Sequence, residues 1–156
     1  EVPNWPRRSY ELRDDGVAVV RFDDFDAPTL EWADALFDDF AVTPPRGLVI
    51  DLRTNGGGYF NITALMLAHL FDRRIEVAEW DGRLINRRWH TDGSATPYLG
   101  PVGVLTGPAD GDRIESRGVA PDITVPHNWD AVLRGDDPAL DAAIAVVTAE
   151  ADALSR

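Results

Sequence analysis

The feature that most constrains the fold of this chain is a short apolar run that ends in three consecutive glycines. Residues 47–53, Gly-Leu-Val-Ile-Asp-Leu-Arg, have the length and composition of a buried strand, which favours a parallel sheet. Residues 54–58, Thr-Asn-Gly-Gly-Gly, follow as a turn. Residues at helical spacing then mark one face of a helix: Ile62, Leu65, Met66, His69 and Leu70. A strand, a glycine turn and a helix form the βα half of a crossover unit.

The segments before this unit predict a hairpin and a helix. Residues 9–12 and 16–22 are typical of strands, and Asp14-Asp15-Gly16 between them favours a tight turn. Apolar residues at helical spacing follow, with Thr29 as the expected N-cap and Pro44-Pro45 as the stop: Leu30, Ala33, Leu36, Phe37 and Phe40.

The segments after it predict more strands and a closing helix. Residues 75–80 and 83–89 flank Asp81-Gly82 and indicate a second hairpin. Residues 102–106 have the pattern of a buried strand, and 118–125 that of an extended edge segment. A final helix is expected from Asp137-Pro138, with Leu140, Ala143, Ile144 and Val147 on one face. Strands alternating with helices predict an α/β fold with a mostly parallel central sheet.

Composition limits both the number of domains and the chemistry. The 156 residues contain no repeat and no linker, so we expect a single domain over residues 1–156. No apolar run is long enough for a membrane span, and the N-terminus lacks the pattern of a signal peptide. A net charge of −12 disfavours nucleic acid and anionic lipid as partners. The chain has no cysteine, and all 15 of its basic residues are arginine, so neither a thiol nor a lysine is available as a catalytic group.

The glycine turn is the strongest candidate for a functional site. Glycines at the carboxyl end of a buried strand leave backbone N–H groups bare at a helix N-terminus, where an oxyanion is stabilised. The spacing is equally compatible with a tight turn that binds nothing. It matches neither the phosphate loop, which requires a lysine, nor the spaced glycines of a dinucleotide-binding turn.

Residues 48–58 resemble the "LDLRxNxGG" signature of the tail-specific (C-terminal-processing) serine peptidases. Other segments are similar to that family in the same order. They are residues 16–22 with Phe25, residues 101–106, residues 113–115 with 118–125, and residues 135–144. The resemblance covers most of residues 16–147.

This resemblance implies a crotonase/ClpP-like spiral core and hydrolysis of peptide bonds in polypeptide substrates. It also implies that a backbone N–H of Gly56 or Gly57 forms part of an oxyanion hole. In the family, the strand similar to residues 102–106 leads into a helix that bears the catalytic serine, with a lysine further on as its base. No cofactor and no metal are implied, and the family favours an extracytoplasmic location.

The chain departs from the family pattern after Pro108. Ala109 and the residues after it resemble sequence well downstream of both the nucleophile and the base, and no PDZ-like domain is visible. Three explanations stay open: a segment is omitted between Pro108 and Ala109, the chain truly lacks it, or residues 107–112 form a native hairpin loop. We favour the omitted segment, because the family pattern is good on both sides of the break.

The other candidate residues are weaker. Ser94 lies near His90 and Asp92, but members of a catalytic triad usually come from separate elements, so we expect a solvated loop. We expect His69 to be a satisfied, partly buried side chain and His127 to be exposed. The histidines lack zinc spacing, and the acidic residues at 23–26 and 38–39 lack the spacing of a calcium loop.

Two hypotheses follow. The first is a serine peptidase of the tail-specific family, seen without its nucleophile-bearing segment. The second is a non-catalytic relative that binds peptides or other ligands, or acts as a scaffold. As written, the chain carries neither the family serine nor the family lysine, so it is expected to be inactive by itself.

Overall fold

A four-stranded sheet, sheet A, forms the centre of the computed structural model, which describes residues 6–83, 86–94, 96–107, 121–126 and 128–156. Its strands lie in the order β1 (Arg8–Leu12), β2 (Val17–Phe22), β3 (Gly47–Asp51) and β6 (Val102–Leu105). β1 pairs antiparallel with β2, while β2, β3 and β6 are parallel to one another. The predicted α/β class, the first hairpin and the mostly parallel sheet are therefore confirmed.

Helix α1 (Ala27–Val42) follows β2 and begins three residues earlier than the predicted cap implied. The Asp26 Oδ1 atom accepts a hydrogen bond of 2.9 Å from the Thr29 N–H, so Asp26 is the N-cap. The assignment of Thr29 as the cap was wrong, because Ala27 and Pro28 already belong to the first turn, where proline is well tolerated. The helix ends at Val42, with Thr43 as its C-cap, just before the predicted stop.

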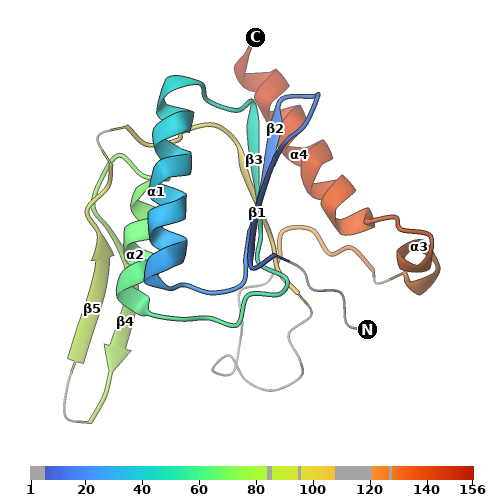
Figure 1. Cartoon of the computed structure of the whole chain (residues 1–156). Coiled ribbons are helices and arrows are strands. Elements are labelled where there is room, and N and C mark those ends of the chain that lie inside the picture. Colours follow the sequence, from blue (N-terminus) through green and yellow to red (C-terminus); the bar gives the residue numbers. More distant parts are fainter. Residues whose placement is uncertain (1–5, 84–85, 95, 108–120, 127) are drawn as a thin grey trace.

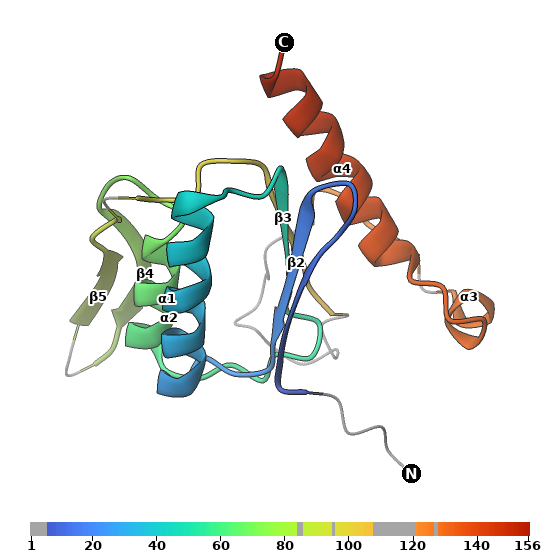
Figure 2. The same cartoon turned by 45° about the horizontal axis from the view of Figure 1, so that its top comes forward.

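The sheet divides the domain into layers (Figures 1 and 2). The helices α1 and α2 (Phe60–Ala68) cover one face, and α4 (Pro138–Leu154) covers the other. Alternate residues of β2 enter different cores: Ala18, Val20 and Phe22 pack against α1 and α2, whereas Val17 packs against α4 with Ile144 and Val147. This period of two is the expected pattern for a sheet buried on both faces.

A two-stranded hairpin lies outside α2 (Figure 1). It consists of β4 (Ile75–Asp81) and β5 (Asn86–Thr91), antiparallel as predicted. On α2, Ile62 and Met66 are buried as expected, but Leu65 is 52% exposed. The prediction that Leu65 lies on the core face was wrong. The third buried residue of this short helix, beside Ile62 and Met66, is Ala64.

The C-terminal part confirms one prediction and corrects another. Helix α4 begins at the predicted Pro138, with Asp137 as its N-cap. An extended edge segment was expected over 118–125; residues 118–120 lie outside the described residues, and 121–126 form no strand. No described strand pairs with these residues, and the Ile123 side chain is 55% exposed, so the apolar pattern is not used for sheet packing. A short helix, α3 (Trp129–Leu133), follows and was not predicted.

Candidate active site

The carboxyl ends of β2, β3 and β6 lie at the same edge of sheet A, because these three strands are parallel. The Leu52 N–H donates a hydrogen bond of 2.8 Å to the Leu105 carbonyl, which joins β3 to β6 at this edge. A Cβ atom on Gly107 would lie 2.9 Å from the Arg53 carbonyl oxygen. The chain therefore leaves β6 directly beside the residue that opens the glycine turn.

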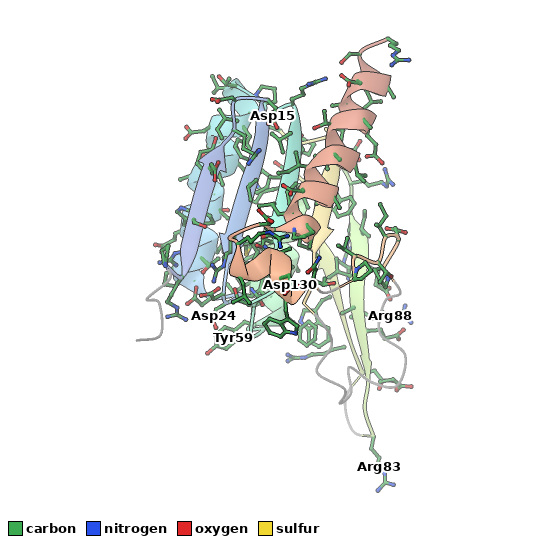
Figure 3. The ribbon with its side chains drawn as sticks, turned by 90° about the vertical axis from the view of Figure 1, so that its right-hand side faces the viewer. Asp15, Asp24, Tyr59, Arg83, Arg88 and Asp130 are labelled. Carbon is green, nitrogen blue, oxygen red and sulfur yellow. The ribbon has the colours of Figure 1, made fainter. Side chains whose placement is uncertain are left out.

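Figure 3 shows this edge from the side of α4. Asp24, which follows β2, and Tyr59, which follows the glycine turn, lie at the same end of the domain. Asp15, in the turn between β1 and β2, lies at the opposite end. The candidate site is thus formed by loops at one end of the sheet, where ligands bind in many α/β proteins.

The glycine turn is fixed to the loop that follows β2. The Gly56 N–H donates to the Asp23 carbonyl at 2.8 Å, and the Phe25 N–H donates to the Gly57 carbonyl at 2.8 Å. The Tyr59 N–H in turn donates to the Phe25 carbonyl at 3.0 Å. These bonds hold the turn as a rigid extension of the sheet.

Asn55 makes a second set of bonds to the same turn. Its Oδ1 atom accepts a hydrogen bond of 2.8 Å from the Gly57 N–H, and its Nδ2 atom donates to the Phe22 carbonyl at 3.1 Å. The N–H groups of both Gly56 and Gly57, which the sequence singled out, therefore already donate to acceptors within the protein. The sequence could not show the Gly56 bond, because its acceptor, the Asp23 carbonyl, lies more than thirty residues earlier in the chain. The acceptor of the Gly57 N–H is the side chain of Asn55, two residues before it.

Gly58 differs from its two neighbours. Among the described residues, its N–H donates to no acceptor. The helix α2 begins two residues later, and its N-cap residue, Tyr59, makes no side-chain capping bond. An uncapped helix start carries partial positive charge and free N–H groups, which favour an anion.

Arg53 forms a polar cluster with Asp51 and Asp137 between the end of β3 and the start of α4. The Arg53 guanidinium donates to Asp51 at 2.9 and 2.7 Å and to Asp137 at 2.8 and 2.7 Å. The pKa of Arg53 is raised, first by its hydrogen bonds to Asp51 and then by those to Asp137. The bond from Arg53 is also the main reason why the pKa of Asp137 is lowered. The ionised form of Asp137 is thus favoured, and α4 is anchored to the end of β3.

A second polar cluster fixes Thr54. Its Oγ1 atom donates to Asp23 Oδ1 at 2.6 Å and accepts from Arg21 Nε at 3.1 Å. Arg21 also contacts Asp23, at 3.2 Å. Together with Arg53, these contacts explain why the turn is flanked by charged residues: they position the backbone rather than face a ligand.

The other sequence candidates are not brought together. The Ser94 Oγ accepts a bond from the Thr96 N–H, Asp92 pairs with Arg74, and His90 lies 3.7 Å from Glu76. His69 is partly buried, pairs with Asp34 at 2.7 Å and stacks on Phe37, as expected of a satisfied histidine. His127 and the break between Pro108 and Ala109 lie outside the described residues.

The described part of the chain contains no group of three or more metal-ligating side chains placed to hold an ion. None of its helices combines the length and the apolar composition needed to cross a bilayer.

Comparison with known proteins identifies the family. The model of peptidase family S41 matches residues 16–110, which include β2, β3, the glycine turn and β6. This match spans more than half of the chain, and the chain belongs to peptidase family S41. No curated protein sequence matches it.

Solved structures with a similar fold include two peptidases. One is a photosystem II D1 C-terminal processing protease, with 24% identity, a TM-score of 0.54, and coverage of 65% of this chain and 30% of that one. The other is a putative peptidase from Parabacteroides merdae, with 22% identity, a TM-score of 0.52, and coverage of 65% and 35%. The chain spans about a third of the length of these proteins. At such identities the likeness establishes the shared fold and nothing finer.

Proposed function

We propose that this chain is the core of a serine-type peptidase that hydrolyses peptide bonds in polypeptides. The observation that carries the proposal is the position of the glycine turn, beside the segment that leaves β6. Acyl transfer needs a nucleophile and oxyanion donors within about 3 Å of one carbonyl group. The adjacent parallel strands β3 and β6 end at the same edge of the sheet. The turn after β3 would supply the oxyanion donors, and the segment after β6 would supply the nucleophile.

The oxyanion hole is proposed to use the backbone of the glycine turn. The Gly58 N–H is free of acceptors among the described residues and needs no rearrangement. The Gly57 N–H becomes available if the Asn55 side chain rotates, since its acceptor is the Asn55 Oδ1 atom. The Gly56 N–H is bound to the backbone carbonyl of Asp23 and would require the whole loop to move. Gly57 with Gly58 is therefore the favoured pair.

The nucleophile and its base are proposed to lie in a segment that is absent from this sequence between Pro108 and Ala109. With no lysine among the 156 residues, the family base has no equivalent here. An insertion after Gly107 would emerge beside Arg53 and so beside the glycine turn. The remainder of residues 1–156 is proposed to form one domain, with the crotonase/ClpP-like spiral core completed by that segment.

A second candidate function is a binding or scaffolding relative that has lost the chemistry. It is favoured by the absence of lysine and by the engaged N–H groups of Gly56 and Gly57. Such a protein would keep the loop edge of the sheet as a peptide-binding surface and would hydrolyse nothing.

Hydrolysis of an unstructured polypeptide separates the two functions. The complete natural protein is incubated with casein, with and without a serine-directed fluorophosphonate. The peptidase proposal expects that casein fragments form in the untreated sample. They should not form when the protein has first reacted with the reagent. Intact casein after prolonged incubation would favour the binding relative instead.

A further inference from the structure

Two aromatic side chains stack beside the glycine turn. Phe60 is the first residue of α2, and its ring centroid lies 4.9 Å from that of Trp89 on β5, at an interplanar angle of 26°. Phe60 is nevertheless 52% exposed, and the neighbouring Tyr59 is 68% exposed. Phe60 and Tyr59 therefore present apolar surface to solvent, while Trp89 is half-buried.

These aromatics differ from those of the main core. Phe22, Phe37 and Phe40 are each at most 9% exposed and pack between sheet A and the two helices. Phe60 and Trp89 belong to neither of the two buried clusters. The stack joins α2 to β5 and still leaves the Phe60 ring 52% exposed, so a ligand can reach it from solvent.

The pair lies within reach of a polypeptide held at the glycine turn. Phe60 is two residues after Gly58, so their Cα atoms are at most about 7.6 Å apart. One residue of an extended peptide spans about 3.4 Å. A substrate carbonyl at the Gly58 N–H would thus place a side chain one or two residues away next to the aromatic pair.

The charge beside the pair is positive. Trp89 and Arg87 lie on the same face of β5, because successive strand residues alternate between faces. The opposite face is neutralised, with Arg88 paired to Glu79 at 2.9 Å. Arg87 is exposed, and within the described ranges it forms no ion pair with an acidic side chain.

We propose that Phe60 and Trp89 form a subsite for a large apolar side chain of the polypeptide, and that Arg87 favours an acidic residue next to it. The proposal rests on the proposed function, since the occupant is the polypeptide bound at the glycine turn. Aromatic pairing supplies affinity for the apolar side chain. The arginine repels a basic neighbour and attracts a carboxylate.

Binding of short capped peptides to the 156-residue chain tests this without requiring catalysis. The probe is acetyl-Ala-Ala-Phe-Glu-Ala-Ala-amide, compared by titration calorimetry with versions in which Phe becomes Ala or Glu becomes Lys. We expect the loss of Phe to weaken binding about tenfold. The change of Glu to Lys should weaken it about two- to fivefold, as for an exposed ion pair.

Variants assign the effect to the proposed residues. Trp89→Ala and Phe60→Ala should each remove most of the preference for Phe, Trp89→Phe should retain it, and Arg87→Gln should remove only the preference for Glu. Leu65→Ala is the matched control, because Leu65 is on the same helix and is equally exposed at 52%. It should leave both preferences unchanged. A melting curve for each variant verifies that it is folded.

The outcomes are distinct from those of the hydrolysis experiment. Equal affinity for all three peptides, no binding at millimolar concentration, or a Phe preference that survives Trp89→Ala would each overturn the subsite. Hydrolysis of casein by the complete protein would leave the peptidase proposal standing in those cases. A Phe preference carried by Trp89 without any hydrolysis would retain the subsite and contradict only the catalytic assignment.

Discussion

Arg53 binds Asp137 through two parallel hydrogen bonds of 2.8 and 2.7 Å, although the two residues are 84 positions apart. The same guanidinium holds Asp51 with two more bonds. One side chain therefore joins the end of β3, the start of the glycine turn and the N-cap of α4. Because the bonds are charge-assisted and bidentate, they fix orientation as well as distance.

Replacement of Arg53 by alanine is expected to destabilise the domain strongly. Asp51 is only 7% exposed, so it would be left as a buried carboxylate without its partner. We expect a loss of about 2–4 kcal/mol in the free energy of unfolding, measured by denaturant titration. Arg46→Ala removes an exposed ion pair with Asp152 and should cost less than about 1 kcal/mol. Equal losses for the two variants would show that the Arg53 cluster has no special role.

Because the Tyr98 hydroxyl is buried, we expect the free energy of unfolding to fall at alkaline pH. Its hydroxyl donates toward the Pro45 and Pro101 carbonyls, and burial raises its pKa to about 12 from 10.0. A raised pKa means that the folded state keeps its proton while the unfolded state loses it. Stability is therefore fully present below pH 10 and falls as the pH rises toward 12, by about 2 kcal/mol for this group.

Comparison with Tyr98→Phe isolates this effect. The variant is expected to be less stable at neutral pH, because two carbonyls lose a donor, but to show a shallower decline above pH 10. Unfolding free energies measured from pH 8 to 11.5 provide the two slopes. Parallel slopes for the two proteins would contradict the burial of the Tyr98 hydroxyl.

Replacement by alanine should destabilise the protein to different extents at two adjacent glycines of the candidate site. Gly57 and Gly58 both have positive φ angles, of 100° and 148°. A Cβ atom at Gly58 would lie 2.3 Å from the Phe25 carbonyl oxygen, whereas one at Gly57 meets nothing within 4 Å. We expect Gly57→Ala to cost about 1–2 kcal/mol in backbone strain alone.

Gly58→Ala adds the steric overlap with Phe25 to the same backbone strain. Its melting temperature should therefore fall well below that of Gly57→Ala. A Gly58→Ala protein as stable as the Gly57→Ala protein would mean that the turn is not held against Phe25 as the structure shows.

The contact between β3 and α4 depends on a glycine facing a valine. A Cβ atom at Gly47 would lie 3.0 Å from Val147 Cγ2, and Val147 is fully buried. Gly47→Ala should destabilise by overpacking, and Val147→Ala by about 1–3 kcal/mol through the lost methyl groups. The double variant should be more stable than the sum of the two losses predicts, because the new methyl group enters the vacated space. Strict additivity in a double-mutant cycle would contradict this packing.

The local elements of this fold could be predicted from the sequence, because their signals are local. Asp14-Asp15-Gly16 indicated the first hairpin, and Asp137-Pro138 indicated the start of α4. The N-cap of α1 was misplaced because Thr29 and Asp26 are both good capping residues. The absence of a strand at 121–126 could not be foreseen, since a strand depends on a partner elsewhere in the chain.

The candidate site was predictable only in position. The glycine pattern located the turn, but the acceptors of the Gly56 and Gly57 N–H groups are set by tertiary contacts with Asp23 and by the Asn55 rotamer. The stack of Phe60 on Trp89 likewise joins residues from separate elements, α2 and β5. Which groups remain free for a ligand is therefore a property of the folded chain.

The peptidase proposal requires a serine-bearing segment between Pro108 and Ala109, next to the glycine turn. Peptide mapping by mass spectrometry of the complete natural protein, after reaction with a fluorophosphonate, tests it most directly. Trypsin cleaves after arginine, so the sequence as it stands yields one peptide over residues 89–113. We predict that this peptide is absent and that a serine in additional sequence after Pro108 carries the phosphonyl adduct. An intact 89–113 peptide with no adduct anywhere in the protein would contradict the peptidase account.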